Sequence, residues 1–232
     1  MKLGGLQKNS LIDYPGKVSC VIFLAGCNFD CPYCHNPSLV KGSTECPASL
    51  KGGGLYEFLE SRRSFLDGVV ISGGEPTLQK NLVRLCEAIK GLGYSIKLDT
   101  NGSRPEELKR LIKEGLIDYI AMDIKTDPAD YNQMVGYGCN PEDILSSIVT
   151  IMESAPAYEF RTTCVKGFVD ERIIKKIAKL IRDADLYALQ QFRKTEMLHP
   201  EFFNGTGSGY SEEDIINLKT IAEQWVKKCI VR

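Results

Sequence analysis

Three cysteines that lie close together are the residues best suited to chemistry. Cys27, Cys31 and Cys34 form a C-x3-C-x2-C pattern directly after the apolar segment 18–24. Thiolates are soft ligands, and three on one short loop can converge on a soft metal ion or an iron–sulfur cluster without closure of a long loop. No fourth cysteine completes the pattern, so a cluster bound here would keep one iron with an open position for another ligand.

A structural zinc site is the alternative interpretation of this loop. His35 follows Cys34, and three cysteines with one histidine are an accepted set of zinc ligands. Adjacent residues rarely point at one ion, which disfavours Cys34 and His35 as joint ligands. A non-catalytic zinc-binding interaction module stays open as a function of another class.

The other six cysteines do not repeat this pattern. With an odd total of nine cysteines and no export signal, the sequence does not indicate a disulfide framework. Cys46 and Cys139 lie in polar loops, and their role stays open. The remaining four lie within apolar strand or helix patterns, where cysteine packs as a small hydrophobic residue: Cys20, Cys86, Cys164 and Cys229.

The composition predicts one large α/β domain. At 232 residues, 43% hydrophobic and 25% charged, the chain can bury a substantial core. We expect a single domain over 1–232, with a core at about 11–192 and a loop and C-terminal helix in 199–232. The net charge of -1 and the pI near 6.2 argue against a nucleic-acid-binding surface. Without an apolar run of about 18 residues or a signal peptide, a cytoplasmic protein with no membrane partner is expected.

Apolar segments of strand length alternate with longer amphipathic segments, which is typical of β–α units around a parallel sheet. We predict six strands, at 18–24, 69–72, 94–99, 119–123, 158–165 and 187–192. Helices are expected at 55–63, at 79–90 with Gly91 as a left-handed C-cap, from Pro105, from Pro141, at 170–182, and after a capping box at Ser211. Six strands are too few for a closed eight-stranded barrel, so an open partial barrel is expected.

Polar and glycine-rich motifs follow the second, third and fourth predicted strands: Gly73-Gly74-Glu75-Pro76, Asp99-Thr100-Asn101-Gly102 and Asp123-Ile124-Lys125. Carboxyl ends of parallel strands meet at one edge, so these motifs and the cysteine loop should share a site. The glycine loop can hold an ammonium group. Two neighbouring carboxylates, Asp99 and Asp123, need a cation between them or one raised pKa. Arg161, on the apolar fifth strand, needs an anionic or polar partner.

The order and spacing of these motifs resemble a known family. The cysteine loop with the aromatic Tyr33 before its last cysteine, followed by Gly73-Gly74-Glu75-Pro76, resembles the radical S-adenosylmethionine (SAM) superfamily. Segments 13–16, 34–37, 98–102 and 123–125 resemble the activating enzymes of glycyl-radical enzymes, most closely those of anaerobic ribonucleoside-triphosphate reductase. The resemblance covers about 11–192 and leaves the tail after 199 unmatched.

The resemblance implies a partial (β/α)6 TIM-like barrel with a [4Fe–4S] cluster on Cys27, Cys31 and Cys34. Its open iron would bind SAM, which makes the three cysteines catalytic. Further SAM-binding positions implied by the resemblance are Tyr33, Gly73, Gly74, Glu75, Asp99, Lys125, Arg161 and Gln191 with its neighbours in 190–192. A monovalent cation, Na⁺ or K⁺, is implied at Asp99, Thr100 and Asp123.

The implied reaction is reductive cleavage of SAM to a 5′-deoxyadenosyl radical that generates a glycyl radical on a partner enzyme, anaerobic ribonucleotide reductase. Cys46 is the only cysteine between Cys34 and Gly73, so no second cluster is expected in that segment. An external reductant of the flavodoxin or ferredoxin type is therefore implied. A radical SAM enzyme acting on a small molecule, such as 7-carboxy-7-deazaguanine synthase, is the alternative. The glycine- and aromatic-rich segment 199–210 is either a partner-docking loop or a linker.

Overall fold

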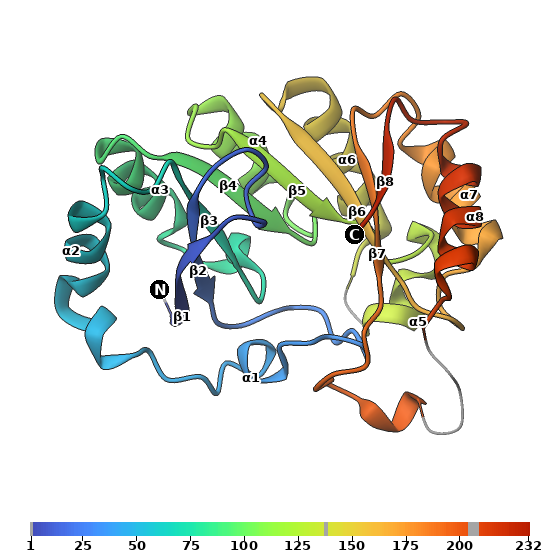
Figure 1. The fold of residues 1–232 in the computed structure, drawn as a ribbon, viewed down its shortest axis with the longest axis horizontal. Coiled ribbons are helices and arrows are strands. Elements are labelled where there is room, and N and C mark those ends of the chain that lie inside the picture. Colours follow the sequence, from blue (N-terminus) through green and yellow to red (C-terminus); the bar gives the residue numbers. More distant parts are fainter. Residues whose placement is uncertain (1, 137–138, 204–208) are drawn as a thin grey trace.

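The computed structural model describes residues 2–136, 139–203 and 209–232. Their strands form one eight-stranded sheet, with helices between the strands (Figure 1). The strands follow one another in the order of the chain. They are β1 (Leu3–Ser10), β2 (Ser19–Leu24), β3 (Gly68–Gly73), β4 (Ser95–Thr100), β5 (Tyr119–Asp123), β6 (Tyr158–Cys164), β7 (Tyr187–Gln191) and β8 (Cys229–Val231). The helices are α1 (Pro37–Val40), α2 (Gly54–Ser61), α3 (Leu82–Gly91), α4 (Pro105–Lys113), α5 (Tyr131–Val135), α6 (Pro141–Ser154), α7 (Glu171–Leu180) and α8 (Glu212–Ala222).

The six predicted strands are confirmed as β2 to β7, a continuous parallel series. The open partial barrel expected from their number is therefore the observed architecture. Two edge strands were missed: β1 pairs antiparallel with β2, and β8 pairs parallel with β7. Their sequences explain this, because β1 mixes two glycines with polar residues and β8 has only three residues.

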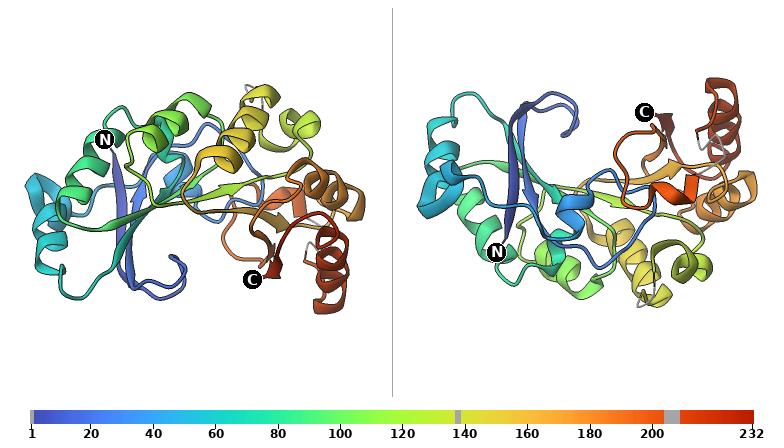
Figure 2. Two further views of the ribbon diagram at one scale, coloured as in Figure 1. Left: turned by 90° about the horizontal axis from the view of Figure 1, so that it is seen from above. Right: turned by 90° about the horizontal axis from the view of Figure 1, so that it is seen from below.

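The helices bury apolar side chains against the convex face of the sheet. Figure 2 shows α3, α4 and α6 together on one side of the sheet, with the turn that connects β1 and β2 on the other. In α7, Ile173, Ile174 and Ile177 recur at helical spacing and are all buried. The predicted start of α8 is confirmed, since the Ser211 side chain accepts a hydrogen bond from the Asp214 N–H. The left-handed cap at Gly91 is wrong: α3 includes Gly91, and Gly93 has the positive φ of 88°.

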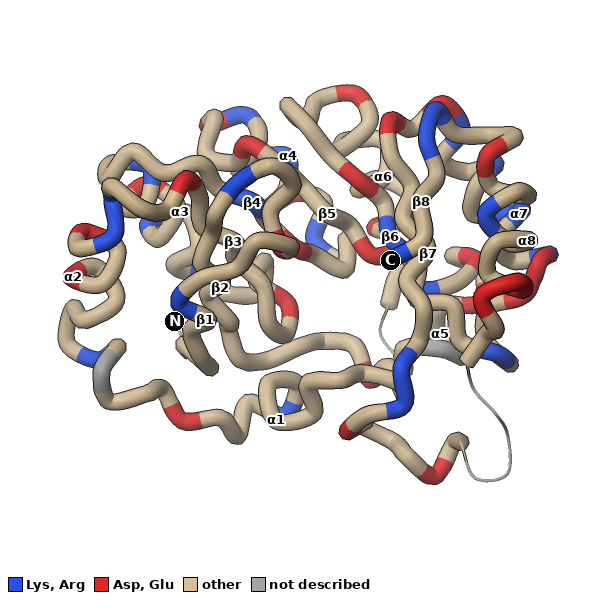
Figure 3. The backbone as a smooth tube through the Cα atoms, in the orientation of Figure 1, with Lys and Arg blue, Asp and Glu red and all other residues tan. Residues whose placement is uncertain are grey.

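Alternate residues of the same strands face the concave side, where the side chains differ in kind. The strands carry Lys97, Asp99, Asp123, Glu159 and Arg161 between the residues that pack against the helices. Figure 3 shows charged positions of both signs along β4, β5 and β6. Glu159 is fully buried, and Arg232 donates to its two carboxylate oxygens at 2.8 and 2.6 Å. Charges of both signs thus line the interior of the barrel. No helix in the described part of the chain has the length and apolar character needed to cross a membrane.

Candidate functional site

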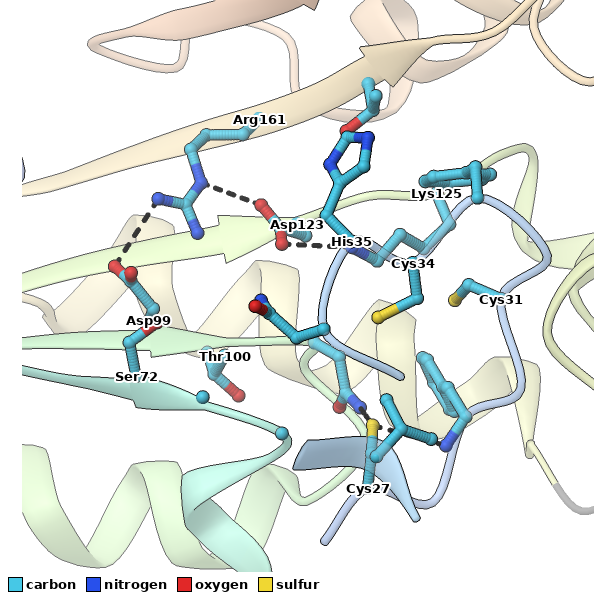
Figure 4. Close-up of a pocket in the computed structure, with 18 of the residues that line it drawn as sticks. Cys27, Cys31, Cys34, His35, Ser72, Asp99, Thr100, Asp123, Lys125 and Arg161 are labelled. Carbon is cyan, nitrogen blue, oxygen red and sulfur yellow. Dashed lines mark hydrogen bonds and ion pairs between the residues drawn. The ribbon is translucent and has the colours of Figure 1, made fainter. Parts of the chain in front are cut away.

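One pocket at the carboxyl ends of the strands contains most of the residues singled out in the sequence. Its cavity is about 280 Å³, close to the lower end of the usual range for small-molecule sites. Figure 4 shows the three cysteine sulfurs on one side and the charged side chains of β4, β5 and β6 on the other. The lining includes Cys27, Tyr33, Cys31, Cys34, Ser72, Gly73, Gly74, Asp99, Thr100, Asp123, Lys125, Arg161, Thr163 and Gln190.

Bonds to neighbouring segments shape the cysteine loop, which lies outside regular secondary structure. Gly26 has a φ of 99° and donates to the Leu39 carbonyl at 2.7 Å, which turns the chain away from β2. The Asp30 N–H donates to the Val135 carbonyl at the end of α5 at 2.7 Å. The sulfur of Cys27 accepts contacts from the Phe29 N–H at 3.4 Å and from Asn101 Nδ2 at 3.9 Å. Such N–H donors stabilise negative charge on a ligand sulfur.

The surroundings of the thiols favour metal ligation over free thiolates. Burial raises the pKa of Cys27 and raises that of Cys31 to about 12, although the Lys125 ammonium opposes both increases. These thiols are therefore neutral on their own, and a thiolate would need a cation beside it. Three soft donors with no protein ligand in a fourth position suit an iron–sulfur cluster with one open iron.

The zinc alternative fits the geometry poorly. His35 Nε2 lies 2.9 Å from the Arg193 carbonyl oxygen, and its ring stacks on Phe192 at a centroid distance of 5.6 Å. In Figure 4 the ring of His35 points away from the three sulfur atoms. Among the described residues, no three His, Cys, Asp or Glu side chains are placed so that they could bind one metal ion. Thiols spaced around a cavity suit a cluster of several irons better than a single ion.

The two glycines of the loop after β3 allow it to lie against the start of the cysteine loop. A Cβ on Gly73 would come within 2.3 Å of the Leu24 carbonyl oxygen, and one on Gly74 within 2.1 Å of the Gly26 oxygen. The N–H groups of Gly74 and Glu75 donate to these same carbonyls, both at 2.8 Å. An ammonium group needs acceptors, so the carbonyl groups of this loop are the ones that could bind it.

Glu75 is placed differently from the expectation that it contacts the cofactor. It is fully buried and does not belong to the pocket lining. Its carboxylate accepts hydrogen bonds from Thr77, from Thr100 Oγ1 at 2.8 Å and from the Asn101 N–H at 2.7 Å. Glu75 therefore ties the loop after β3 to the loop after β4, and its buried side chain lies outside the pocket lining where an ammonium group could bind.

Asp99 and Asp123 are balanced by cations on neighbouring residues. Arg161 lies beside Asp123 in the register of β5 and β6; its Nε donates to Asp123 Oδ1 at 2.7 Å, and its Nη1 lies 3.4 Å from Asp99 Oδ1. Asp99 also pairs with Lys97, and Asp123 Oδ2 with Lys125 Nζ at 2.9 Å. Burial alone would raise the pKa values of both carboxyl groups, but Arg161 and the lysines hold them below the usual range.

This network changes the expectation of a monovalent cation. Two neighbouring carboxylates need a cation between them or one raised pKa, and the Arg161 guanidinium is such a cation. Thr100, the third expected ligand, lines the pocket, but its hydroxyl donates to Glu75 and accepts from the Gly102 N–H at 3.1 Å. A cation at Asp99, Thr100 and Asp123 would require these partners to rearrange.

Lys125 remains a cation although it is buried. Burial lowers its pKa, but Asp123 more than compensates and holds the pKa well above the ordinary value. Its side chain lines the pocket near the cysteine loop. Lys97, Lys125 and Arg161 carry three positive charges beside the two carboxylates of Asp99 and Asp123. One positive charge is therefore left to attract an anionic group of a ligand.

Some predictions on the β7 side of the pocket need correction. Gln190, not Gln191, lines the pocket, because alternate residues of a strand face opposite sides. Gln191 instead donates from Nε2 to the Tyr210 carbonyl at 3.1 Å. Tyr33 lies in the pocket wall, edge-on to Phe192, and its buried hydroxyl has no hydrogen-bond partner among the described residues. Neither Cys46 nor Cys139 belongs to the described lining.

Further contributors were not identified from the sequence. Ser72 and Thr163 line the pocket, and strand alternation could have indicated Thr163, which lies two residues after Arg161. Asn28, inside the cysteine loop, donates to Ser103 Oγ at 2.9 Å and accepts from Asn101 Nδ2 at 3.1 Å. Nothing in the sequence pattern indicates these last two contacts.

Comparisons with known proteins agree with this geometry. The model of the radical SAM superfamily matches residues 21–181. A Methanocaldococcus jannaschii protein, provisionally named a glycyl-radical enzyme activating enzyme, is 37% identical over 235 residues, or 99% of this chain and 95% of the relative. The pyruvate formate-lyase-activating enzyme of Streptococcus mutans is 28% identical, over 79% of this chain and 68% of its own.

The solved structures extend the agreement to the fold. Streptococcus suis SuiB, bound to its precursor peptide SuiA, superposes with a TM-score of 0.69 at 14% sequence identity. The match covers 91% of this chain and 48% of SuiB. The partial barrel, the family model over most of the chain and the full-length relative lead to one conclusion: this protein belongs to the radical SAM superfamily and, within it, to the glycyl-radical enzyme activating enzymes.

Proposed function

We propose that this protein generates a glycyl radical on a partner enzyme, with a [4Fe–4S] cluster on Cys27, Cys31 and Cys34 and with SAM as co-substrate. The observation that carries the proposal is the meeting of three thiols, a glycine loop and Lys125 in one pocket. When bound there, the cluster supplies the electron that cleaves SAM to methionine and a 5′-deoxyadenosyl radical, which takes a hydrogen atom from a glycine α-carbon of the partner.

The residues of the pocket position the methionine part of SAM. The carbonyl groups of Gly73 and Gly74 would accept hydrogen bonds from its ammonium group, because an ammonium group only donates and these carbonyls are acceptors at the rim of the pocket. Lys125, held as a cation by Asp123, pairs with its carboxylate. The buried rings of Phe29 and Tyr33 help to exclude water, which protects a reactive radical from side reactions.

The adenosine part would lie toward β6 and β7. Arg161 and Gln190 face this part of the pocket and can reach the nucleoside. The ion pairs of Arg161 also decide when a monovalent cation could bind. A Na⁺ or K⁺ ion could bind Asp99 and Asp123 only after the Arg161 side chain turns away from them and toward the nucleoside. Cation binding is therefore part of the proposal only in the cofactor-bound state.

We assign anaerobic ribonucleoside-triphosphate reductase as the partner. The support is the resemblance of four segments to the activating proteins of that reductase: 13–16, 34–37, 98–102 and 123–125. Between Cys34 and Gly73 the sequence has one cysteine, Cys46, which cannot hold a second cluster alone. A flavodoxin- or ferredoxin-type protein would therefore deliver the electron.

The decisive experiment combines the reconstituted protein with each candidate partner under anaerobic conditions. Iron and sulfide are added to rebuild the cluster, dithionite reduces it, and SAM starts the reaction. We expect a glycyl-radical doublet in electron paramagnetic resonance (EPR) with the reductase, and no doublet when its target glycine is replaced by alanine.

Other outcomes would overturn parts of this proposal. A radical on pyruvate formate-lyase but not on the reductase would keep the reaction and change the partner. Deoxyadenosine formed with no radical on any partner would point to a small-molecule substrate. Bound zinc without iron or labile sulfide would contradict the proposal as a whole.

A further inference from the structure

Residues 192–203, which follow β7, lie along the cysteine loop and bond to its main chain. The Leu198 N–H donates to the Cys34 carbonyl at 3.0 Å, and the His199 N–H donates to the Pro32 carbonyl at 3.1 Å. Residues 204–208, part of the predicted docking loop or linker, lie outside the described residues. Residues 199–203 bond to the candidate ligand loop, and their role as a docking loop or a linker stays a prediction.

The side chain of His199 adds a second connection to the loop. Its Nε2 lies 3.0 Å from Asp30 Oδ1, and its Nδ1 lies 3.1 Å from Glu201 Oε1. On the opposite side, the Asp30 N–H is bonded to the Val135 carbonyl. The cysteine loop is therefore held between α5 and residues 198–199, and Asp30 takes part in both attachments.

An aromatic layer covers the same part of the loop. Phe192 and Phe203 are buried and stack with centroids 5.6 Å apart and an interplanar angle of 19°. His35 stacks on Phe192, and Tyr33 contacts both Phe192 and Phe168. Cys31, in the same loop as Tyr33 and His35, is only 7% exposed. The segment thus limits the access of water to the ligand loop, a factor that tunes the properties of a metal centre.

We infer that residues 192–203 form a clamp on the cysteine loop, and that His199 is a positioning residue for the cluster. The inference rests on the proposed function, since it presumes that Cys27, Cys31 and Cys34 are ligands. The loop has no helix or strand of its own from Cys27 to Cys34, so bonds from other segments set the directions of its thiols. Two of those bonds, to the carbonyls of Pro32 and Cys34, come from the clamp.

Hydrogen–deuterium exchange on the cluster-free protein tests the clamp without any use of activity. In the His199→Ala variant we expect the amides of residues 198 and 199 to exchange at least about tenfold faster than in the wild type, because the contact between the imidazole and the Asp30 carboxylate is lost. His199→Gln retains a donor near the Nε2 position and should restore most of the protection. Lys194→Ala, an exposed change in the same segment, is the matched control and should have no effect.

EPR of the reduced cluster tests the positioning role. We expect His199→Ala to alter the spectrum and to weaken its change on addition of SAM, while His199→Gln and Lys194→Ala keep the wild-type response. Should His199→Ala fail to fold, Asp30→Asn serves in its place, because the Asp30 side chain is 63% exposed and its change should spare the fold.

The experiments distinguish a failure of the clamp from a failure of the proposed function. If the wild type binds no cluster, the proposed function is wrong, while the exchange rates still decide whether the segment clamps the loop. If His199→Ala or, where that variant is unfolded, Asp30→Asn matches the wild type in exchange and in the EPR spectrum, the clamp is wrong.

Discussion

The two faces of the sheet are formed by alternate residues of the same strands, but one face is apolar and the other is charged. On the convex face, Ile96 and Leu98 of β4 belong to the large apolar core beneath the helices. On the concave face, the intervening Lys97 is buried and the following Asp99 is partly buried, and Asp99 pairs with both Lys97 and Arg161. Apolar packing requires matching volumes, whereas every buried charge requires a specific partner.

The two faces of the sheet tolerate substitutions to different degrees. An apolar side chain on the convex face can be exchanged for another of similar size at small cost. A charged side chain on the concave face cannot be changed without leaving its partner unpaired, because removing one member of a buried ion pair exposes the other to an uncompensated desolvation penalty. The concave face and its rim are therefore the sensitive part of the molecule.

The largest expected difference is between two cysteines, one on each side. Cys34→Ala at the rim should abolish cluster binding and SAM cleavage, since it removes one of three iron ligands. Cys86→Ala in α3, within the convex core, should leave both intact and reduce only stability. Iron and sulfide content, with deoxyadenosine formation, measures the difference. Equal loss in the two variants would contradict the assignment of the ligands.

A change at the centre of the concave network should have the next largest effect. Arg161→Met should lower the free energy of unfolding by about 3 kcal/mol at neutral pH, because it leaves the two partly buried carboxylates of Asp99 and Asp123 with less compensation. Urea denaturation measures this change, with Lys194→Met as an exposed control. A loss as small as that of the control would show that the network contributes little to stability.

The pH dependence of the same variant sharpens the test. Asp99 and Asp123 have pKa values below the ordinary value of 3.8 in the folded protein, so the stability they confer is present above that pH. It is lost as the pH falls through the lower, folded pKa values. The stability difference between wild type and Arg161→Met should therefore shrink as the pH falls from 7 to below 3.8, and a constant difference would contradict the ion-pair explanation.

The smallest effect is expected for a conservative change on the convex face. Ile174→Val in α7 removes one buried methylene group and should cost about 1 kcal/mol. The EPR spectrum of the cluster and the affinity for SAM should stay unchanged. Thermal unfolding with parallel EPR measures both, and an altered spectrum would mean that the two faces are coupled more strongly than their separate packing suggests.

Much of the fold could be predicted because local signals and the fold agree. Runs such as Val69-Val70-Ile71 are apolar throughout, as strands covered on both faces are, and the helices between them carry clear periodicity and caps. The edge strands β1 and β8 lack such runs, and their pairing with β2 and β7 stabilises them.

For the candidate site, the thiol spacing, the glycine loop and the charged strand ends can be read from the sequence, because each is a local pattern with a chemical meaning. Which of these groups are free to bind a ligand depends on contacts between distant segments. The tertiary structure assigned Glu75 to a bond between loops, placed Gln190 in the lining in preference to Gln191, set Arg161 between two carboxylates and laid His199 on the cysteine loop. The physical reason is that a hydrogen-bond partner far away in the sequence leaves no trace in local spacing or periodicity.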